Sequence, residues 1–239
     1  MLIQCERHTD KDIDLWKEHE EVDLLNYTLL NIKSKTERAI EILTEFAPDY
    51  FSISWGKDSV VLAHLAWGFS KKSVLAHFTH VADALYFNDV RDCFLFSYPI
   101  QYHEFSKEIG RVDEFFDFHA LQIKKQASVA LGKRYVTGIR TQESPERKIT
   151  VRKNGLISGN SCRPIARWTT DDIFAYLAHH NLPVHPNYAM LGGGRYERNS
   201  IRVGPMWMGS QKGKEMWEKE YYGDVLRKLQ LKILGGTGE

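Results

Sequence analysis

The chain has 239 residues, of which 43% are hydrophobic, so it can build a full hydrophobic core and is not a disordered protein. Its 32 lysines and arginines nearly balance its 31 aspartates and glutamates, which excludes nucleic-acid binding through overall charge and leaves only a local patch for such contacts. The three cysteines, Cys5, Cys93 and Cys162, are widely spaced and odd in number, which excludes a disulfide framework and a Cys-x-x-Cys metal site and suits a reducing cytoplasm.

The chain is expected to open with two helices that pack on a core. Residues 12–33 carry apolar side chains at helical spacing, and a second helix is predicted to begin at Ser34, whose spacing to Glu37 is that of a capping box. Pro48 ends this second helix. The N-terminal sequence soon becomes charged, unlike a signal peptide, and no apolar run approaches the length of about 18 residues that a membrane span needs. We therefore expect a cytoplasmic protein without membrane contact.

A strand, a loop and a helix in the first third of the chain form its most informative stretch. The pattern predicts a buried strand at Tyr50–Ser54, a tight loop at Ser54–Ser59 and an apolar helix that stops near Gly68. A strand that turns at a glycine into a helix N-terminus presents free backbone N–H groups and the positive end of the helix dipole. Lys57 adds a full positive charge and the loop serines add hydroxyl donors, so the loop is predicted to bind phosphates.

The loop sequence Ser54-Trp55-Gly56-Lys57-Asp58-Ser59 lacks the spacing of the common P-loop and of the dinucleotide fingerprint. It resembles the S-G-G-K-D-S pyrophosphate loop of the N-type ATP pyrophosphatases, in the adenine nucleotide alpha hydrolase superfamily. In that family the loop holds the β- and γ-phosphates as a leaving unit while a nucleophile attacks the α-phosphorus. Trp55 stands where the family has its first glycine, so the tight turn is expected to rely on Gly56 alone. The resemblance implies that all six residues contact the nucleotide.

Further strands and helices alternate along the chain. Strands are expected at Ser73–Thr79, Pro99–Phe105 and Lys133–Ile139, with helices near Asp89–Tyr98 and Phe115–Ala130. This alternation indicates an α/β fold with a Rossmann-like, doubly wound parallel sheet. Such sheets bind ligands beyond the carboxyl ends of their strands, so functional residues should follow the strands.

Residues 80–89, after the second strand, resemble a worn version of the family motif D-T-G-x-x-F-P-E. Phe87 and Asp89 are in register with it, Ala82 falls on the family aspartate, and Asp83 lies one place further along. Two interpretations stay open. Asp83 supplies the carboxylate that contacts the nucleotide, or it is a loop residue or helix cap.

The stretch after the fourth strand closely resembles G-[IV]-R-x-x-E-S-x-x-R, a motif of the 3′-phosphoadenylylsulfate (PAPS) reductase branch of that superfamily. The resemblance places Gly138 at the nucleotide and implies that Arg140 and Arg147 hold phosphates through bidentate contacts. Glu143 would keep the arginines in place. Glu143 and Ser144 are also candidates for handling the acceptor or sulfur.

Two more motifs follow. Residues 163–177 resemble the family's R-P-[IL]-x-x-W-x-x-x-D-[IV]-[WF]-x-[YF], with Thr169 and Asp172 as the cap of a helix. Residues 182–190 resemble the P-x-N-P-L-Y turn that comes next in the family. The resemblance, to the PAPS reductase/ATP sulfurylase type, therefore runs from about residue 49 to residue 205.

Cys162 directly precedes these motifs, and two interpretations of it stay open. It could receive a persulfide or attack an activated substrate, with Arg163 favouring its thiolate and the pair handling sulfur or acceptor. It could instead be a small buried residue. The second interpretation is favoured because free cysteines are commonly part of the core.

The chain departs from its relatives at two places. Several relatives have R-[IVF]-G-C-x-x-C-P, whose cysteines bind an iron–sulfur cluster, whereas this chain has Pro205 and Met208 at the cysteine positions. Neither side chain can bind as a thiolate, so no iron–sulfur cluster is expected. The C-terminal E-C-G-L-H nucleophile of PAPS reductases is also missing. Sulfate reduction by that thiol is therefore not expected.

The last part of the chain, residues 191–239, is expected to hold a basic glycine-rich loop and a helix at 212–234. The arginines of the loop, Arg195 and Arg202 among them, could bind an anionic second substrate such as a nucleic-acid backbone, or the loop could be ordinary and solvated. The histidines lack a clear ligand spacing, so no zinc site is expected. With residues 1–47 and 48–190, this segment is expected to form one compact domain.

The resemblance implies an ATP pyrophosphatase that uses Mg²⁺-ATP to adenylate an anionic acceptor in a sulfur-transfer pathway. Lys57, Asp58, Arg140 and Arg147 would act in catalysis, and Asp58 would help to place Mg²⁺. The functional model is the ATP pyrophosphatase of bacterial DNA phosphorothioation, with DNA as acceptor and a cysteine desulfurase and other sulfur-transfer subunits as partners.

Other functions stay open. A sulfate adenylyltransferase small subunit or a divergent PAPS reductase would use the same loop. A non-catalytic nucleotide-sensing module is the alternative from another class. Trp55 and Ala82 at family positions favour it, and the intact Lys57 and Asp58 argue against it.

Overall fold

A computed structural model of the chain describes residues 1–78, 85–105, 118–203 and 214–235. Within these residues, a six-stranded sheet has the order β3-β2-β1-β4-β6-β5, and its neighbouring strands are parallel except β5 and β6. The predicted Rossmann-like α/β fold is confirmed. The strands are β1 (Tyr50–Ile53), β2 (Val74–Phe78), β3 (Gln101–Phe105), β4 (Tyr135–Thr137), β5 (Ile157–Ser158) and β6 (Ser161–Cys162).

The strand order reverses beside the central strand β1. From β1 the chain proceeds to β2 and β3 on one side and then returns to β4 on the other. Phe51 of β1 is in register with Leu75 of β2 and Val136 of β4, and all three side chains are buried. In doubly wound sheets the ligand crevice opens beyond the carboxyl ends of the strands at such a reversal. The residues that follow β1 and β4 therefore border the same crevice.

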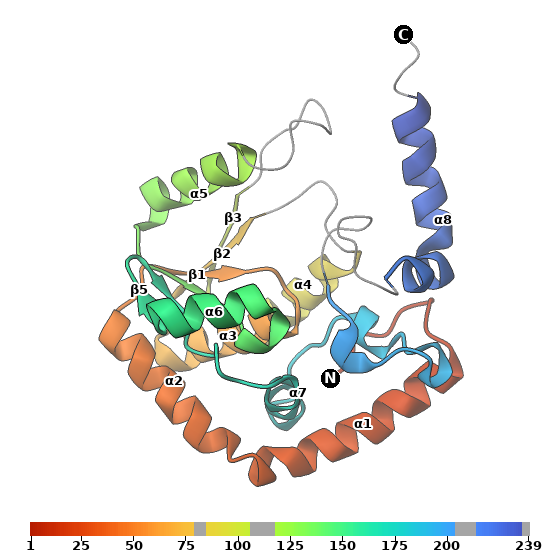
Figure 1. The fold of residues 1–239 in the computed structure, drawn as a ribbon, viewed down its shortest axis with the longest axis horizontal. Coiled ribbons are helices and arrows are strands. Elements are labelled where there is room, and N and C mark those ends of the chain that lie inside the picture. The colour runs from red at the N-terminus through yellow and green to blue at the C-terminus, as the bar shows by residue number, and fades with distance from the viewer. Residues whose placement is uncertain (79–84, 106–117, 204–213, 236–239) are drawn as a thin grey trace.

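Helices cover both faces of the sheet (Figure 1). On one face α5 (Phe118–Leu131) lies against β2 and β3, over a small buried cluster. The larger core lies on the other face, where α3 (Lys57–Phe69) packs against β1 and against α7 (Thr170–His179). The helix predicted after the loop is thus confirmed, although Gly68 lies inside its last turn and does not stop it.

The first two helices begin at other residues than predicted. α1 spans Asp10–Leu29 after a Thr9–Asp12 capping box, and α2 spans Ile32–Phe46. The prediction that a capping box starts the second helix at Ser34 is wrong. Asn31 adopts a left-handed conformation that turns the chain before Ser34, which therefore lies within the helix.

The buried side of α1 also differs from the expected apolar side. Trp16 is buried, but Val22, Leu25 and Leu29 are 53%, 67% and 77% exposed. Asp12 and Asp23 are buried in their place, because their carboxylates bind groups of the segment that follows residue 190. The hydrophobic periodicity therefore predicted that this segment is helical but not which side of the helix is buried.

The helix cap predicted at Thr169 and Asp172 is confirmed by a capping box. The main buried cluster contains residues from all three predicted segments, which supports the proposal of one compact domain.

Among the described residues, none of the helices has the length and apolar character needed to cross a membrane. The other elements are α4 (Phe87–Ser97), η2 (Thr141–Glu143), α6 (Pro145–Asn154), η3 (Pro186–Ala189), η4 (Gly192–Gly194), η5 (Arg198–Ser200) and α8 (Lys214–Gly235).

A buried histidine beside the crevice should make the fold sensitive to acid. The His185 ring donates from Nε2 to the Leu85 carbonyl (2.6 Å) and accepts at Nδ1 from the Asn187 N–H (3.2 Å), and burial lowers its pKa to about 3. Between this pKa and the ordinary value near 6.5 the unfolded state binds the proton more readily, so the free energy of unfolding should fall as the pH falls through that range. Burial also lowers the pKa of His64 and of His180 to about 4, which adds to the effect.

The test is urea unfolding of the wild type and of His185→Gln at several pH values between 7 and 4. The variant should lose less stability on acidification than the wild type, even if it is weaker at pH 7. Equal losses in the two proteins would contradict the assignment.

Candidate active site

A cavity of about 360 Å³ opens where the strand order reverses. One wall is the end of β1 with the start of α3, and the other is the end of β4 with Thr137 and Gly138. Tyr188, Arg202 and Val203 close it from the later part of the chain. The volume is that of a small-molecule site. The structure therefore brings together residues of the phosphate loop, of the motif after β4, and of the region after residue 182.

The turn of the phosphate loop is made by the tryptophan and not by the glycine. Trp55 has φ +59°, in the left-handed region, whereas Gly56 is extended with φ −76°. The prediction that the turn relies on Gly56 alone is therefore wrong. The indole is completely buried, with its ring centroid 5.7 Å from Phe94 and 5.8 Å from Tyr102. The Trp55 side chain thus packs in the core and does not line the cavity.

The strained turn and the buried indole have opposite effects on stability, and two substitutions separate them. Trp55→Ala should lower the free energy of unfolding by about 3–5 kcal/mol, because it empties a buried aromatic site. Trp55→Gly loses the same contacts but relieves the left-handed conformation, which is worth about 1 kcal/mol. The glycine variant should therefore be the more stable of the two in urea unfolding. An alanine variant as stable as the glycine variant would contradict a left-handed Trp55.

Hydrogen bonds hold the phosphate loop at both of its ends. The Ser54 N–H donates to the Ser59 hydroxyl (3.0 Å), and the two serine hydroxyl oxygens are 2.9 Å apart. The Lys57 N–H donates to the hydroxyl of Tyr188 (3.3 Å), and the Lys57 ammonium lies 5.2 Å from the centre of the Tyr188 ring. The N-terminus of α3 thereby faces the cavity, as an anion site requires.

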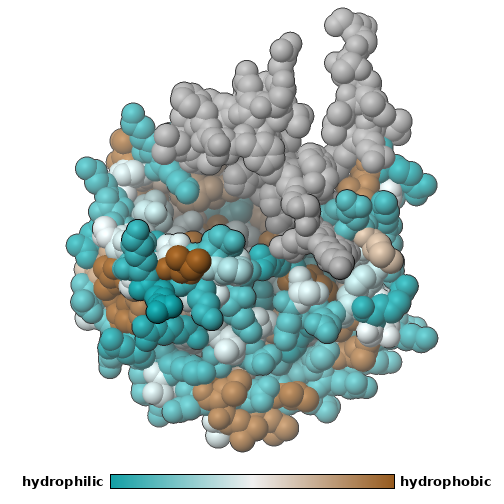
Figure 2. Space-filling model, viewed as in Figure 1, coloured by the Kyte–Doolittle hydropathy of each residue, from teal (hydrophilic) through white to brown (hydrophobic). Residues whose placement is uncertain are grey.

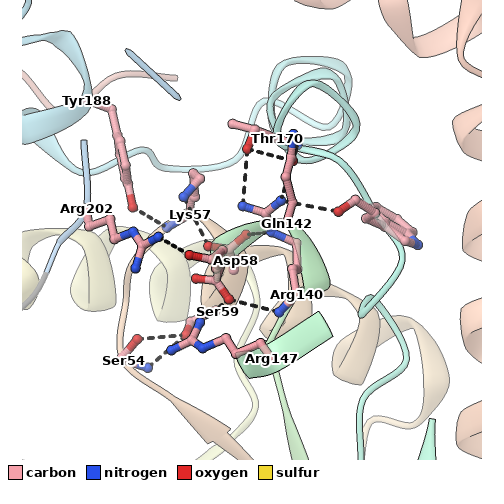
Figure 3. A network of polar contacts seen from close by, with 12 residues as sticks. Ser54, Lys57, Asp58, Ser59, Arg140, Gln142, Arg147, Thr170, Tyr188 and Arg202 are labelled. Atoms are coloured by element: carbon pink, nitrogen blue, oxygen red, sulfur yellow. Dashed lines mark hydrogen bonds and ion pairs between the residues drawn. The ribbon is translucent and has the colours of Figure 1, made fainter. Parts of the chain in front are cut away.

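Asp58 lies between two cations (Figure 3). Its Oδ2 is 3.1 Å from the Lys57 ammonium, and its Oδ1 accepts from Nε of Arg140 at 2.5 Å. The other Arg140 nitrogens donate to the side chains of Gln142 and Thr170 and to the carbonyl of Trp168. The Arg140 side chain is buried and does not line the cavity. Arg140 therefore positions Asp58, and through it Lys57, while four of its five N–H donors bind these protein groups.

The magnesium role predicted for Asp58 stays a prediction. Both oxygens of Asp58 bind cations, so Mg²⁺ would share the carboxylate with Lys57 or Arg140. The Glu143 side chain, the other carboxylate at the cavity, also binds positive or N–H groups. Among the residues that the structure describes, no group of three or more metal-binding side chains could hold an ion.

Glu143 organises the opposite rim of the cavity. Its carboxylate accepts from the Arg140 N–H (2.9 Å) and from the Arg147 guanidinium, and its carbonyl accepts from the Arg202 guanidinium. Arg147 and Arg202 both line the cavity. These two arginines, rather than Arg140, are the guanidinium groups placed to meet an anionic ligand. Ser144 lies just beyond, where its hydroxyl caps α6 by accepting from the Arg147 N–H (3.2 Å).

Close backbone packing explains why position 138 is a glycine. A Cβ atom at Gly138 would lie 3.4 Å from the backbone of Asp58, which is tight. The end of β4 thus approaches the first turn of α3 more closely than a larger residue would easily permit. Gly138 lines the cavity, as predicted for a residue at the nucleotide.

Cys162 lies in β6, away from the cavity lining. Its side chain is buried, and burial raises the pKa of the thiol to about 12, although the neighbouring Arg163 acts in the opposite direction. A protonated, enclosed thiol is a poor nucleophile. The structure therefore favours the interpretation of Cys162 as a small buried residue, and Arg163 does not line the cavity either.

The basic glycine loop is held in place by acidic residues. Asp12 accepts from the N–H groups of Leu191 and Gly193, and the Arg195 guanidinium pairs with Glu220. Arg195 does not line the cavity, so Arg202 is the loop arginine that reaches it. Asp83 and the segment with Pro205 and Met208 lie outside the described residues.

Three contributors to the site could not be identified from the sequence. Tyr188 was part of a recognised turn motif, but its role as acceptor for the Lys57 N–H depends on the fold. Gln142 and Thr170 were also passed over, although their side chains bind the buried Arg140. Tyr188 and Thr170 are distant in sequence from the groups that they bind, so no local pattern marks them. Gln142 is only two positions from Arg140, but its bond depends on how the chain turns after β4.

Comparison with known proteins shows which family and which solved structures the chain resembles. A family model described as the phosphoadenosine phosphosulfate reductase domain matches residues 49–191. No curated protein sequence matches the chain. Among solved structures, the PAPS reductase of Candida auris in a phosphate complex is similar with a TM-score of 0.52 and 15% identity, over 75% of this chain and 96% of that one.

Two other enzymes have the same fold. The U34-tRNA thiolase NcsA of Methanococcus maripaludis, solved with its [4Fe-4S] cluster, is similar with a TM-score of 0.51 and 12% identity, over 82% of this chain and 72% of that one. The NMN synthetase of Francisella tularensis has a TM-score of 0.51 and 11% identity, over 82% of this chain and 86% of that one. At such low identity these structures establish the fold alone.

Proposed function

The chain belongs to the phosphoadenosine phosphosulfate reductase domain family, and from this premise we propose that it cleaves ATP between the α- and β-phosphates to adenylate an anionic acceptor. The observation that carries the proposal is the placement of Lys57 and the α3 N-terminus in the cavity at the strand reversal. This is the position in which an α/β sheet binds phosphates.

The chain's own residues would act mainly by electrostatic stabilisation. The acceptor oxygen attacks the α-phosphorus, the bond from that phosphorus to the bridging oxygen breaks, and pyrophosphate leaves with the bonding electrons. Lys57 and the N–H groups at the start of α3 would stabilise the charge that develops on pyrophosphate. Arg147 and Arg202 would bind phosphate oxygens at the other rim. Asp58, held by Arg140, would orient Lys57, and Mg²⁺ would enter on the triphosphate.

The pathway that we propose is sulfur transfer, with a DNA backbone phosphate as acceptor, as in DNA phosphorothioation. Arg147 and Arg202 provide positive charge at the open rim, where an anionic acceptor would meet the α-phosphorus. No cysteine among the described residues lines the cavity. The proposal therefore takes sulfur from a separate donor, such as a cysteine desulfurase.

The proposed function is tested by exchange of labelled pyrophosphate into ATP. Because adenylation is reversible, the protein with Mg²⁺-ATP, labelled pyrophosphate and a DNA duplex should return label to ATP. Omission of the duplex should lower the rate if DNA is the acceptor. A protein that binds ATP but exchanges no label with any acceptor would instead be a non-catalytic nucleotide-sensing module.

A further inference from the structure

Helix α6 carries an unusual concentration of positive charge beside the cavity. Its ten residues include four basic side chains and one acidic side chain, Glu146, although the whole chain has a net charge of only +1. Arg147 pairs with Glu143, whereas Lys148, Arg152 and Lys153 are exposed and have no ion pair among the described residues. The surface over α6 is mostly hydrophilic (Figure 2).

The three exposed cations of α6 have no ion pair among the described residues, whereas several other arginines that lie in or contact the C-terminal part of the chain are paired with carboxylates. Arg195 pairs with Glu220, and Arg198 forms a buried pair with Asp23 at 2.5 Å and 2.8 Å. Arg7 likewise binds both oxygens of Asp224. The glycine-rich loop, which the sequence made a candidate for nucleic-acid contact, therefore uses much of its charge internally. Exposed lysines without an ion pair also lie elsewhere in the described chain, but on α6 three unpaired cations follow one another beside the cavity.

Helix stability does not account for all of this charge. Arg152 and Lys153 lie in the last turn, where cations favourably meet the negative end of the helix dipole. Lys148 is one turn earlier on the same side as Arg152, and like charges at this spacing destabilise a helix slightly. A charge that the fold does not use is available for a ligand.

The α6 cations continue the positive rim of the cavity. Arg202 and Arg147 meet at Glu143, and α6 then rises about 9 Å from Arg147 to Lys153. Each DNA strand presents one phosphate about every 3.4 Å of the helix axis, so this length corresponds to two or three consecutive phosphates. A small anion would need only the cavity, whereas exposed cations along α6, with Lys148 and Arg152 on one side, can meet more than one phosphate of a chain.

We infer that the exposed face of α6, with Lys148, Arg152 and Lys153, binds the DNA backbone and guides one phosphate to Arg147 and Arg202 at the cavity. This inference rests on the proposed function for its choice of DNA. The surface contacts phosphates rather than bases, so binding should be largely independent of sequence and sensitive to salt.

The test is fluorescence anisotropy of a labelled DNA duplex at several KCl concentrations. The triple variant Lys148→Gln/Arg152→Gln/Lys153→Gln should bind about tenfold or more weakly than the wild type, and the slope of log affinity against log salt should fall in magnitude by about 2–3. The control Lys33→Gln/Lys72→Gln/Lys125→Gln removes equal charge from exposed lysines elsewhere and should retain wild-type binding.

Equal binding by the two triple variants, or no binding by the wild type, would overturn the inference. An α6-dependent preference for an RNA duplex of the same sequence would overturn the choice of DNA. Pyrophosphate binding by the same preparations reports separately on the cavity. If the wild type does not bind pyrophosphate while its DNA binding depends on α6, the proposed activity fails and the binding surface stands.

Discussion

Replacing Lys57 by alanine is expected to slow AMP formation from Mg²⁺-ATP by about 10²–10³-fold, with little change in fold. Lys57 is the one lysine among the described residues that line the cavity, and Asp58 and Tyr188 hold its ammonium group there. In the proposed reaction, the charge on the leaving pyrophosphate grows as the bond to the α-phosphorus breaks. Loss of a fixed cation should therefore raise the barrier more than it weakens ATP binding. The measurement is the single-turnover rate at saturating ATP.

Lys71→Ala is the matched control for this substitution. Lys71 lies just beyond the other end of α3, where its ammonium group is 3.3 Å from the centre of the Trp67 ring. It is exposed and far along the helix from the loop, so the control should keep the wild-type rate. A Lys57→Ala protein with a normal single-turnover rate would remove Lys57 from the mechanism, provided that its thermal unfolding matches that of the control.

The second large effect is expected from Arg140, and it concerns stability. Arg140→Met should lower the free energy of unfolding by about 3–5 kcal/mol, because it takes one of the two cations from Asp58 and leaves the Trp168 carbonyl and the Thr170 hydroxyl without their donor in a buried region. Arg147→Met should change stability by less than about 1 kcal/mol, because its pair with Glu143 is 40% exposed on the arginine side. Urea unfolding of both variants measures the difference.

Pyrophosphate binding should depend more on Arg147 than on Arg140, which is the reverse of the order expected for stability. Arg147→Met removes a cation from the cavity rim and should weaken pyrophosphate binding about ten- to a hundredfold, the range of a charged hydrogen bond. Arg140→Lys keeps a positive charge but not the fork of donors, so it should recover little of the lost stability. Normal pyrophosphate binding by Arg147→Met would contradict its role at the cavity rim, and wild-type stability of Arg140→Lys would contradict the structural role of the Arg140 fork.

The fold could be predicted from the sequence because its signals are local. The buried strand β1, the glycine in the loop and the apolar helix α3 lie next to one another in the chain, and each has its own pattern. The capping box at Thr169 was similarly visible from residue spacing. The face of α1 could not be predicted, because its buried aspartates are stabilised by groups more than 150 positions away in the chain.

The candidate site was predicted in outline but not in its division of roles. The motif after β4 identified both arginines, yet only the fold shows that Arg140 is enclosed by Gln142, Trp168 and Thr170 while Arg147 faces the cavity. A motif gives residue types in order, whereas exposure depends on what packs around them. The left-handed Trp55 was missed for a related reason. Propensity assigns such a turn to glycine, and tertiary packing of the indole overrides it.

The central claim is that the cavity directs cleavage to the bond between the α- and β-phosphates. The most direct measurement is identification of the products after the protein is incubated with Mg²⁺-ATP, with and without a DNA duplex. We expect AMP or an AMP adduct together with pyrophosphate, formed by the wild type and Lys71→Ala but not by Lys57→Ala. ADP and inorganic phosphate as the Lys57-dependent products would contradict it.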